Sequence, residues 1–279
     1  MKKVLVCIDG SELTRHVCDY GIDIAKKLGV PLLILNAVEH THQIVTQDLS
    51  GNIGLGTRDT LLEQYTNEDM NLSKSLIAEG KALLKEMKEY AIEQGVEECE
   101  ALQRHGSLQE NLTELSEDIK IAIIGLRGKD ENSIGSHVES LLRAMNTPFL
   151  LVNSEFKPIE SILMAYDGSD FANKAIEVAT KSPIFPNTKR YVVNVSQNAA
   201  ESKRVLSHAK NLFGDSSYEL EIESLSGDSV TSLLEYQEKH DIDIIAMGAY
   251  SGNRLKSMIF GSFTTKMFLN AKKPLLVFR

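Results

Sequence analysis

The sequence has no tryptophan, only 3 cysteines and 6 prolines among 279 residues, and no long apolar run. A membrane-spanning helix needs about 18 consecutive apolar residues, and no stretch reaches that length. The apolar run Val4–Ile8 near the start is too short for the core of a signal peptide. Three widely spaced cysteines, Cys7, Cys18 and Cys99, form no disulfide framework, which is typical of a reducing compartment. We therefore expect a cytoplasmic protein with no membrane insertion.

Basic charge is also scarce, because 30 lysines and arginines face 39 aspartates and glutamates, giving a net charge of −9. This balance argues against nucleic acid as a partner, since a general nucleic-acid binder presents a basic face. His40 and His42 are close in sequence, but no cysteine or acidic cluster accompanies them at metal-site spacing. No nucleophile–base pair is recognisable by spacing. We predict neither a metal site nor a dedicated enzyme.

The first half of the chain alternates apolar strands with helical patterns. A strand at 4–8 leads into the tripeptide Asp-Gly-Ser at 9–11, and a helical periodicity then runs to Gly29, a candidate C-cap. The near-continuous apolar run at 32–38 predicts a second strand that is buried on both faces. A strand–helix–strand order of this kind implies a parallel sheet.

The remainder of the first half begins with a polar segment, 39–70, which we interpret as a long loop. A helical pattern follows over 72–94. Further strands and helices are then expected in alternation, as a strand near 99–102, a helix from 106, a strand at 119–124, a helix from 135 and a strand at 148–152.

The second half repeats this order after a loose link at 153–160. A second Asp-Gly-Ser tripeptide stands at 167–169, and the closing segment 274–278 matches the segment 148–152. Internal repetition of this kind decides the architecture. We predict two tandem domains, 1–153 and 159–279, each an open α/β sandwich with a five-stranded parallel sheet flanked by helices.

A glycine-bearing stretch follows the fourth strand of each half. In the second half it runs from Gly248 to Ser262, between an apolar strand and a helix-like segment. Backbone N–H groups and a helix N-terminus converge on an anion in such a connection, so the stretch predicts a phosphate site. An ordinary strand–loop–helix connection is the alternative. An imperfect second copy at 125–136 favours the phosphate site.

Taken together, these motifs resemble the universal stress protein family. They are Asp-Gly-Ser after the first strand, a glycine loop ending in Gly-Ser after the fourth, and a final Pro-Leu-Leu-Val strand. The resemblance covers essentially the whole chain and looks like that of tandem members. It implies Rossmann-like, adenine-nucleotide α-hydrolase-like domains. Many members bind ATP or AMP, whereas others lack the loop and do not; Mg²⁺ as an accompanying ion stays open.

The resemblance also implies site residues in both halves. The second-half loop keeps the family span, although its middle glycine is displaced by one place, and the first-half loop is three residues shorter. We therefore favour the second half as the binding half. The residues implied there are Asp167 at the ribose, Val195 at the adenine, and Gly248, Ser251, Gly252, Gly261, Ser262 and Thr264 at the phosphates. Those implied in the first half are Asp9, Val38, Gly125, Gly128, Gly135 and Ser136.

Each Asp-Gly-Ser tripeptide also suits a role that needs no ligand. Aspartate in this position favours an Asx turn or a helix N-cap, and either is compatible with a contact to a nucleotide. The sequence alone does not decide between a local turn or cap and a contact to a nucleotide.

The sequence therefore predicts an adenine-nucleotide-binding protein with a stress-response or regulatory role. A scaffold of the same fold without nucleotide, a weak ATPase or phosphorylated protein, and an apolar ligand beside 39–70 stay open as alternatives. In the family, the terminal strands pair across a dimer interface. We therefore expect 148–152 and 274–278 to join the halves as an internal pseudo-dimer, and a homodimer of two chains stays open.

Overall fold

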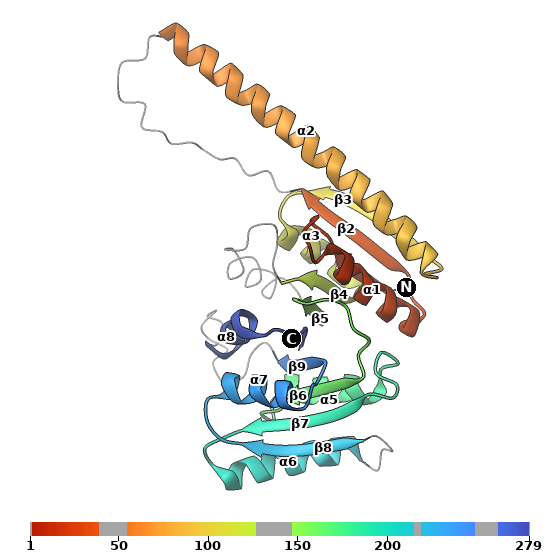
Figure 1. The fold of residues 1–279 in the computed structure, drawn as a ribbon, viewed down its shortest axis with the longest axis vertical. Helices are drawn as coiled ribbons and strands as arrows, with labels where there is room; N and C mark the ends of the chain where they lie inside the picture. The colour runs from red at the N-terminus through yellow and green to blue at the C-terminus, as the bar shows by residue number, and fades with distance from the viewer. Residues whose placement is uncertain (1, 39–54, 127–146, 215–218, 249–261, 279) are drawn as a thin grey trace.

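The computed structural model describes residues 2–38, 55–126, 147–214, 219–248 and 262–278. One ten-stranded sheet forms its centre, in the order β3-β2-β1-β4-β5-β10-β9-β6-β7-β8. Figure 1 shows this sheet running along the molecule, with the first half of the chain at one end and the second half at the other.

The first half contributes five strands in the predicted order. They are β1 (Lys3–Cys7), β2 (Leu32–Val38), β3 (Cys99–His105), β4 (Ile119–Gly125) and β5 (Phe149–Val152). The described helices of this half are α1 (Thr14–Leu28), α2 (Leu55–Glu93), α3 (Leu108–Leu115) and the short 3₁₀ helix η1 (Ser116–Asp118). The helix predicted from residue 135 lies outside the described residues. Gly29 ends α1 in the left-handed conformation, as expected.

The second half repeats this arrangement. Its strands are β6 (Ser161–Ala165), β7 (Lys189–Val195), β8 (Leu220–Leu225), β9 (Ile244–Gly248) and β10 (Leu275–Phe278). Its helices are α5 (Asp170–Lys181), α6 (Ala199–Phe213), α7 (Ser229–Lys239) and α8 (Ser262–Asn270). The α/β fold with a five-stranded parallel sheet in each half is confirmed, because neighbouring strands within each half pair in parallel.

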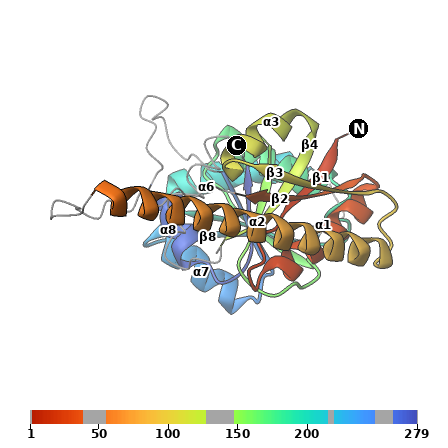
Figure 2. The same cartoon turned by 90° about the horizontal axis from the view of Figure 1, so that it is seen from above.

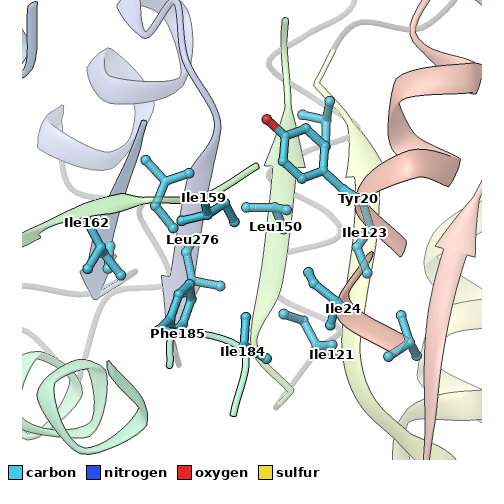
Figure 3. Close-up of a cluster of buried hydrophobic side chains, with 14 of the residues drawn as sticks. Tyr20, Ile24, Ile121, Ile123, Leu150, Ile159, Ile162, Ile184, Phe185 and Leu276 are labelled. Atoms are coloured by element: carbon cyan, nitrogen blue, oxygen red, sulfur yellow. The ribbon is translucent and has the colours of Figure 1, made fainter. Parts of the chain in front are cut away.

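The two parallel sheets join through their last strands. β5 and β10 pair antiparallel, with Leu150 opposite Leu276 at the centre of the pairing. Figure 3 shows these two leucines side by side among apolar side chains from both halves, including Tyr20, Ile123 and Ile162. The seam is therefore part of a hydrophobic core that continues from one half into the other.

Burial on both faces of the sheet explains the continuous apolar runs in the sequence. Along β1, Val4 and Val6 pack in the core on one face, whereas Leu5 and Cys7 pack in the core on the other. Successive side chains of a strand point to opposite faces, so a strand covered on both sides must be apolar throughout.

The link between the halves is held by side chains, so its prediction as a loose segment is wrong. The N–H of Phe156 donates to His16 Nδ1 at 3.3 Å, and the N–H of Lys157 donates to the Tyr20 hydroxyl at 3.3 Å. Asp243 Oδ2 accepts from the N–H of Glu160 and from that of Ser161, each at 2.9 Å. Helix α1 therefore holds the middle of the link, and the turn before β9 holds its C-terminal end.

Helix α2 corrects a second expectation, because it begins at Leu55 and takes up much of the segment predicted as a loop over 39–70. Residues 39–54 lie outside the described residues. Figures 1 and 2 both show the N-terminal part of α2 extending beyond the sheet, while its later part lies along β2 and β3. Leucine, glutamate and glutamine favour helix in the early part of α2, but the sequence there has no one-sided apolar stripe. Among the described strands, none lies along this part of the helix (Figure 1).

Candidate functional site

The carboxyl ends of three second-half strands enclose a small pocket. Parallel strands end at the same edge of a sheet, where open α/β folds bind ligands. β6, β7 and β9 end together here, and the pocket between them has a volume of about 160 Å³. Its lining residues are Ala165, Tyr166, Asp167, Val193, Asn194, Val195, Ser229, Leu233, Gly248 and Phe263. Of the residues named from the sequence, the pocket brings together Asp167, Val195 and Gly248.

Asp167 is positioned by the turn that follows β6. Its Oδ1 accepts a hydrogen bond from the N–H of Ser169 at 3.0 Å, which makes the Asx turn anticipated from the sequence. Gly168 allows the turn because its φ is 79°, in the left-handed region. The N-cap of α5 is Ser169, whose hydroxyl accepts from the N–H of Ala172 at 3.3 Å. The turn and the cap together hold the carboxylate at the edge of the pocket.

Tyr166 forms a fixed wall of the pocket. Its hydroxyl donates to Asn173 Oδ1 at 2.6 Å. Burial, and to a lesser degree the charge of Asp167, raises the pKa of Tyr166 to about 12. The phenol therefore stays protonated at neutral pH and remains a hydrogen-bond donor.

Asn194 lies beneath the turn and was missed by the sequence reasoning. Its side chain is 7% exposed, and Nδ2 donates to the carbonyl oxygen of Tyr166 at 2.7 Å. Its Oδ1 is buried without a hydrogen-bond partner among the described residues. A usable signal was present, because Asn36 follows Asp9 by 27 residues and Asn194 follows Asp167 by the same 27 residues.

Close packing against helix α5 explains why residue 248 is a glycine. A Cβ at this position would lie 2.8 Å from Cβ of Phe171 at the start of α5. A side chain here would therefore collide with the helix that carries the second-half Asp-Gly-Ser turn. The glycine is explained by this contact, whatever the segment after it binds.

Helix α8 begins at Ser262, as the sequence indicated, and Phe263 lines the pocket. Thr264, expected at the phosphates, is 2% exposed and does not line the pocket. Ser251, Gly252 and Gly261 lie outside the described residues.

Two of the site residues named for the first half line a different pocket. Asp9 and Val38 line a cavity of about 330 Å³ between the ends of β1 and β2 and helix α2. Asp9 Oδ1 accepts from the N–H of Ser11 at 2.9 Å, so this aspartate also makes an Asx turn. Gly125 ends β4, and the remaining residues named for this half, Gly128, Gly135 and Ser136, lie outside the described residues.

Helix α2 forms the far wall of this first-half cavity, and the sequence reasoning missed its part. Gly80 faces Asn36 and Gln103, and a Cβ on it would lie 2.2 Å from Asn36 Oδ1. Gln103 Nε2 donates to that same oxygen at 3.2 Å. A glycine within a helical pattern was the signal that another group approaches closely.

The described residues were also compared with the requirements of a metal site and of a membrane-spanning helix. Across the described residues, no group of three or more His, Cys, Asp and Glu side chains is arranged to hold a metal ion. His40 and His42 lie outside that part of the chain. Among the described helices, none is both long enough and apolar enough to cross a membrane.

The fold defines a duplicated α/β protein with a small pocket at the strand ends of its second half. The model of the universal stress protein family matches residues 1–153 and 158–279. The chain therefore belongs to the universal stress protein family, as a tandem member.

Known relatives agree with this membership. The chain is 28% identical to universal stress protein Slr1230 of Synechocystis sp. over 287 residues, covering 100% of both chains. A universal stress protein structure from Archaeoglobus fulgidus matches with a TM-score of 0.74 at 19% identity, covering 99% of this chain and 98% of that one. A putative universal stress protein from Pseudomonas aeruginosa matches with a TM-score of 0.62 at 15% identity, covering 100% and 93%. At these identities the structural matches bear on the fold alone.

Proposed function

We propose that the second half binds an adenine nucleotide, ATP or AMP, and that nucleotide occupancy regulates the protein in a stress response. The observation that carries the proposal is the convergence of Asp167, Val195 and Gly248 on one pocket at the strand ends. Val195 and Gly248 end β7 and β9, and Asp167 lies in the turn just after β6, so the three come from separate parts of the sequence. Family membership supplies the expectation that a nucleotide is the ligand.

The chemistry of the pocket suits one portion of a nucleotide. Val193, Val195 and Leu233 offer an apolar surface for a base, and the Asp167 carboxylate offers acceptors for a ribose hydroxyl. Phosphates would extend toward Gly248 and the N-terminus of α8, where the helix dipole favours an anion. A volume of about 160 Å³ is smaller than the roughly 300–1,000 Å³ of sites that enclose whole ligands. The described pocket is therefore smaller than a site that encloses an entire nucleotide.

A scaffold that binds no nucleotide is the second candidate. Two observations favour it: the small volume of the described pocket, and the contact with Phe171 that gives Gly248 a purely structural reason. A protein that lost the ligand would keep both features.

Binding, and not catalysis, is the activity proposed. Within the described lining of the pocket, Asp167 is the only carboxylate, and no histidine or cysteine side chain stands beside it. General acid–base chemistry would need such a partner within hydrogen-bond reach.

The test compares matched aspartates of the two halves. Asp167→Asn keeps an oxygen for the Asx turn and removes the charge, and Asp9→Asn makes the same change in the first half. ATP and AMP are titrated calorimetrically into wild type and both variants, and nucleotide released from freshly purified protein is identified by mass spectrometry. We expect Asp167→Asn to weaken binding by about tenfold, because a hydrogen bond to a charged group contributes about 1.5–3 kcal/mol. Asp9→Asn is expected to bind like wild type.

Two results would contradict the proposal. If Asp9→Asn weakened binding and Asp167→Asn did not, the first half would be the binding half. If wild type bound neither nucleotide at about 1 mM and released none, the affinity would be too weak for regulation and the scaffold would be favoured.

A further inference from the structure

The first-half cavity lies on the face of the sheet that helix α2 covers. Its volume of about 330 Å³ falls in the roughly 300–1,000 Å³ range of small-molecule sites. Leu83 of its wall packs in the core on the α2 face, whereas Val193 and Leu233 of the second-half pocket pack in the core on the opposite face. The first-half cavity is therefore not a copy of the second-half pocket.

The second half fills the matching place with a side chain. Gly168 of its Asp-Gly-Ser turn corresponds to Gly10, and a Cβ on Gly168 would lie 3.6 Å from Val205 Cγ1 of α6. In the first half, Gly10 borders the cavity instead. The repeated fold does not require an open space here, so the course of α2 is what leaves one.

Much of the wall of the first-half cavity is apolar. Ala37 and Val38 contribute from the end of β2, and Leu76 and Leu83 contribute from α2. Such walls favour a ligand with a hydrocarbon body, because removing apolar surface from water stabilises the complex.

The one neutral polar side chain among the described lining residues is already engaged by the protein. Asn36 Nδ2 donates to the carbonyl oxygen of Ile8 at 3.0 Å, and Asn36 Oδ1 accepts from Gln103 Nε2 at 3.2 Å. The polar contacts of a ligand must therefore come from the charged residues of the wall.

Those charged residues are both carboxylates, and both are exposed. Asp9 lies in the turn after β1 and Glu79 lies on α2, so they belong to different walls. One oxygen of each is used, because Asp9 Oδ1 accepts from the N–H of Ser11 at 2.9 Å and Glu79 Oε1 accepts from the Ser75 hydroxyl at 2.8 Å. Within the described part of the chain, neither carboxylate forms an ion pair with a lysine, arginine or histidine. The cavity therefore selects for positive charge.

The charge of the surrounding half acts in the same direction. Residues 1–153 hold 24 of the 39 acidic residues and 15 of the 30 basic ones, so the whole net charge of −9 belongs to the first half. The field of such a half raises the local concentration of cations, although salt screens it.

We propose that the first-half cavity binds a small organic cation, a primary ammonium group on an apolar body. The ammonium group donates to the remaining oxygens of Asp9 and Glu79. The apolar body packs against Val38, Leu76 and Leu83. A bare metal ion is a poorer match, because the apolar walls would contribute nothing to its binding and Ca²⁺ takes about six to eight oxygen ligands.

The test uses three probes that share a phenylethyl group and differ in charge. 2-Phenylethylamine is a cation, 2-phenylethanol is neutral and 3-phenylpropionate is an anion. Each is titrated into the full-length protein, and binding is followed by the backbone amide signals of Gly10 and Gly80 in the NMR spectrum. We expect the amine to shift both signals with a Kd near about 1 mM, and to bind about tenfold more tightly than the alcohol and more tightly still than the anion. Raising the salt concentration should weaken binding of the amine alone.

Matched variants separate the charge from the apolar contact. Glu79→Gln and Asp9→Asn keep the shape of each side chain and remove its charge, so each should weaken binding of 2-phenylethylamine several-fold and leave 2-phenylethanol unchanged. Leu76→Ala should weaken both probes, because it removes the contact that they share. Glu86→Gln changes an exposed carboxylate of α2 that does not line the cavity, and this control should bind like wild type.

The proposal is overturned if 2-phenylethylamine shifts neither glycine signal up to about 10 mM, a concentration that would reveal even weak sites. It is also overturned if the three probes bind equally, if Glu79→Gln binds the amine like wild type, or if Mg²⁺ or Ca²⁺ displaces the amine at equal concentration. Titrations with ATP and AMP keep this proposal apart from the nucleotide site, because Glu79→Gln should leave nucleotide binding unchanged. Wild type that bound the amine and no nucleotide would contradict the proposed function and support the cation site.

Discussion

The two halves share one topology but differ in the hydrogen bonds made by one buried asparagine in each half. Asn36 in β2 and Asn194 in β7 hold the same place, and each donates its amide to the carbonyl of the residue just before the Asp-Gly-Ser turn, Ile8 at 3.0 Å and Tyr166 at 2.7 Å. In the first half, Gln103 donates to the other atom of the amide, Asn36 Oδ1. In the second half, the strand neighbour of Asn194 is Ser224, and Asn194 Oδ1 has no partner within the described residues.

The covering helix explains this difference. Gly80 of α2 lets the helix approach closely enough to lie over both Asn36 and Gln103. In α6, Ser202 is fully buried, and its hydroxyl lies 2.6 Å from the Ser224 hydroxyl. A serine pair thus replaces the long glutamine, but it does not reach the asparagine. The same sheet topology therefore allows two different hydrogen-bond networks. Which one forms depends on whether the covering helix places a glycine, Gly80, or a serine, Ser202, against the strands.

A second difference lies where the first helix of each half returns to the sheet. In the first half, α1 ends at a left-handed Gly29 and the chain enters β2 almost at once. In the second half, residues 182–188 intervene and fold around the buried side chain of Arg190. Its guanidinium donates to the carbonyl oxygens of Ala179, Phe185 and Thr188. The longer connection is therefore ordered by one charged residue.

The largest effect is expected from giving β7 the first-half residue. Leu32 holds the place of Arg190, so Arg190→Leu removes the donors for three buried carbonyls. Unsatisfied buried acceptors cost about 1–3 kcal/mol each before relaxation, so we expect a loss of about 3 kcal/mol in the free energy of unfolding. Urea unfolding followed by circular dichroism measures it.

The control for Arg190→Leu is Leu32→Met, a nearly volume-conserving change at the same place in β2. It should cost less than about 1.5 kcal/mol. If Arg190→Leu were as stable as wild type, the connection 182–188 would not depend on the guanidinium, and the second difference between the halves would lose its cause.

An intermediate effect is expected from removing the extra donor of the first half. Gln103→Ser makes β3 resemble β8 and leaves Asn36 Oδ1 and the carbonyl of Ile77 without their shared donor. We expect the unfolding free energy to fall by about 2 kcal/mol, from unsatisfied acceptors and a small cavity. Gln109→Ser, an exposed position on α3, is the control and should stay within about 0.5 kcal/mol. Equal losses in the two variants would mean that the amide network contributes nothing specific.

These networks also mark the limit of what the sequence predicted. The strands were readable, because burial on both faces requires continuous apolar runs such as 32–35. Asp167, Val195 and Gly248 were predicted as neighbours by the family resemblance, and they line one pocket because parallel strands end at one edge of the sheet. The pairing of Asn36 with Gln103 depends on strand register, which composition does not reveal. The start of α2 at Leu55 could not be predicted either, because a helical segment that does not pack on a sheet needs no apolar stripe.

A smaller effect is expected at the first helix of each half. Ser169 caps α5 through its hydroxyl, whereas the N-cap of α1 is Leu13, which makes no side-chain cap. Ser169→Ala should therefore cost about 1 kcal/mol of unfolding free energy. Ser11→Ala should cost less than about 0.5 kcal/mol, because Ser11 donates to Asp9 through its backbone N–H, which alanine retains. A larger loss in Ser11→Ala than in Ser169→Ala would reverse this comparison.

The smallest effect depends on pH and compares the caps of α3 and α7. Ser107 caps α3 and is neutral, whereas Asp228 caps α7 and accepts from the N–H and hydroxyl of Thr231, each at 3.0 Å. These hydrogen bonds, and to a lesser degree the charge of Lys266, hold the pKa of Asp228 below its usual range. A depressed pKa means that the stabilisation is present above the unfolded-state pKa of about 3.9 and is lost as the pH falls through the folded-state value. Asp228→Ser gives α7 the cap of α3. At pH 7 this variant should therefore unfold at a lower urea concentration than wild type. The difference between the two midpoints should disappear on acidification below the unfolded-state pKa. A difference that stayed constant over that range would show that the charge of Asp228 has no part in the cap.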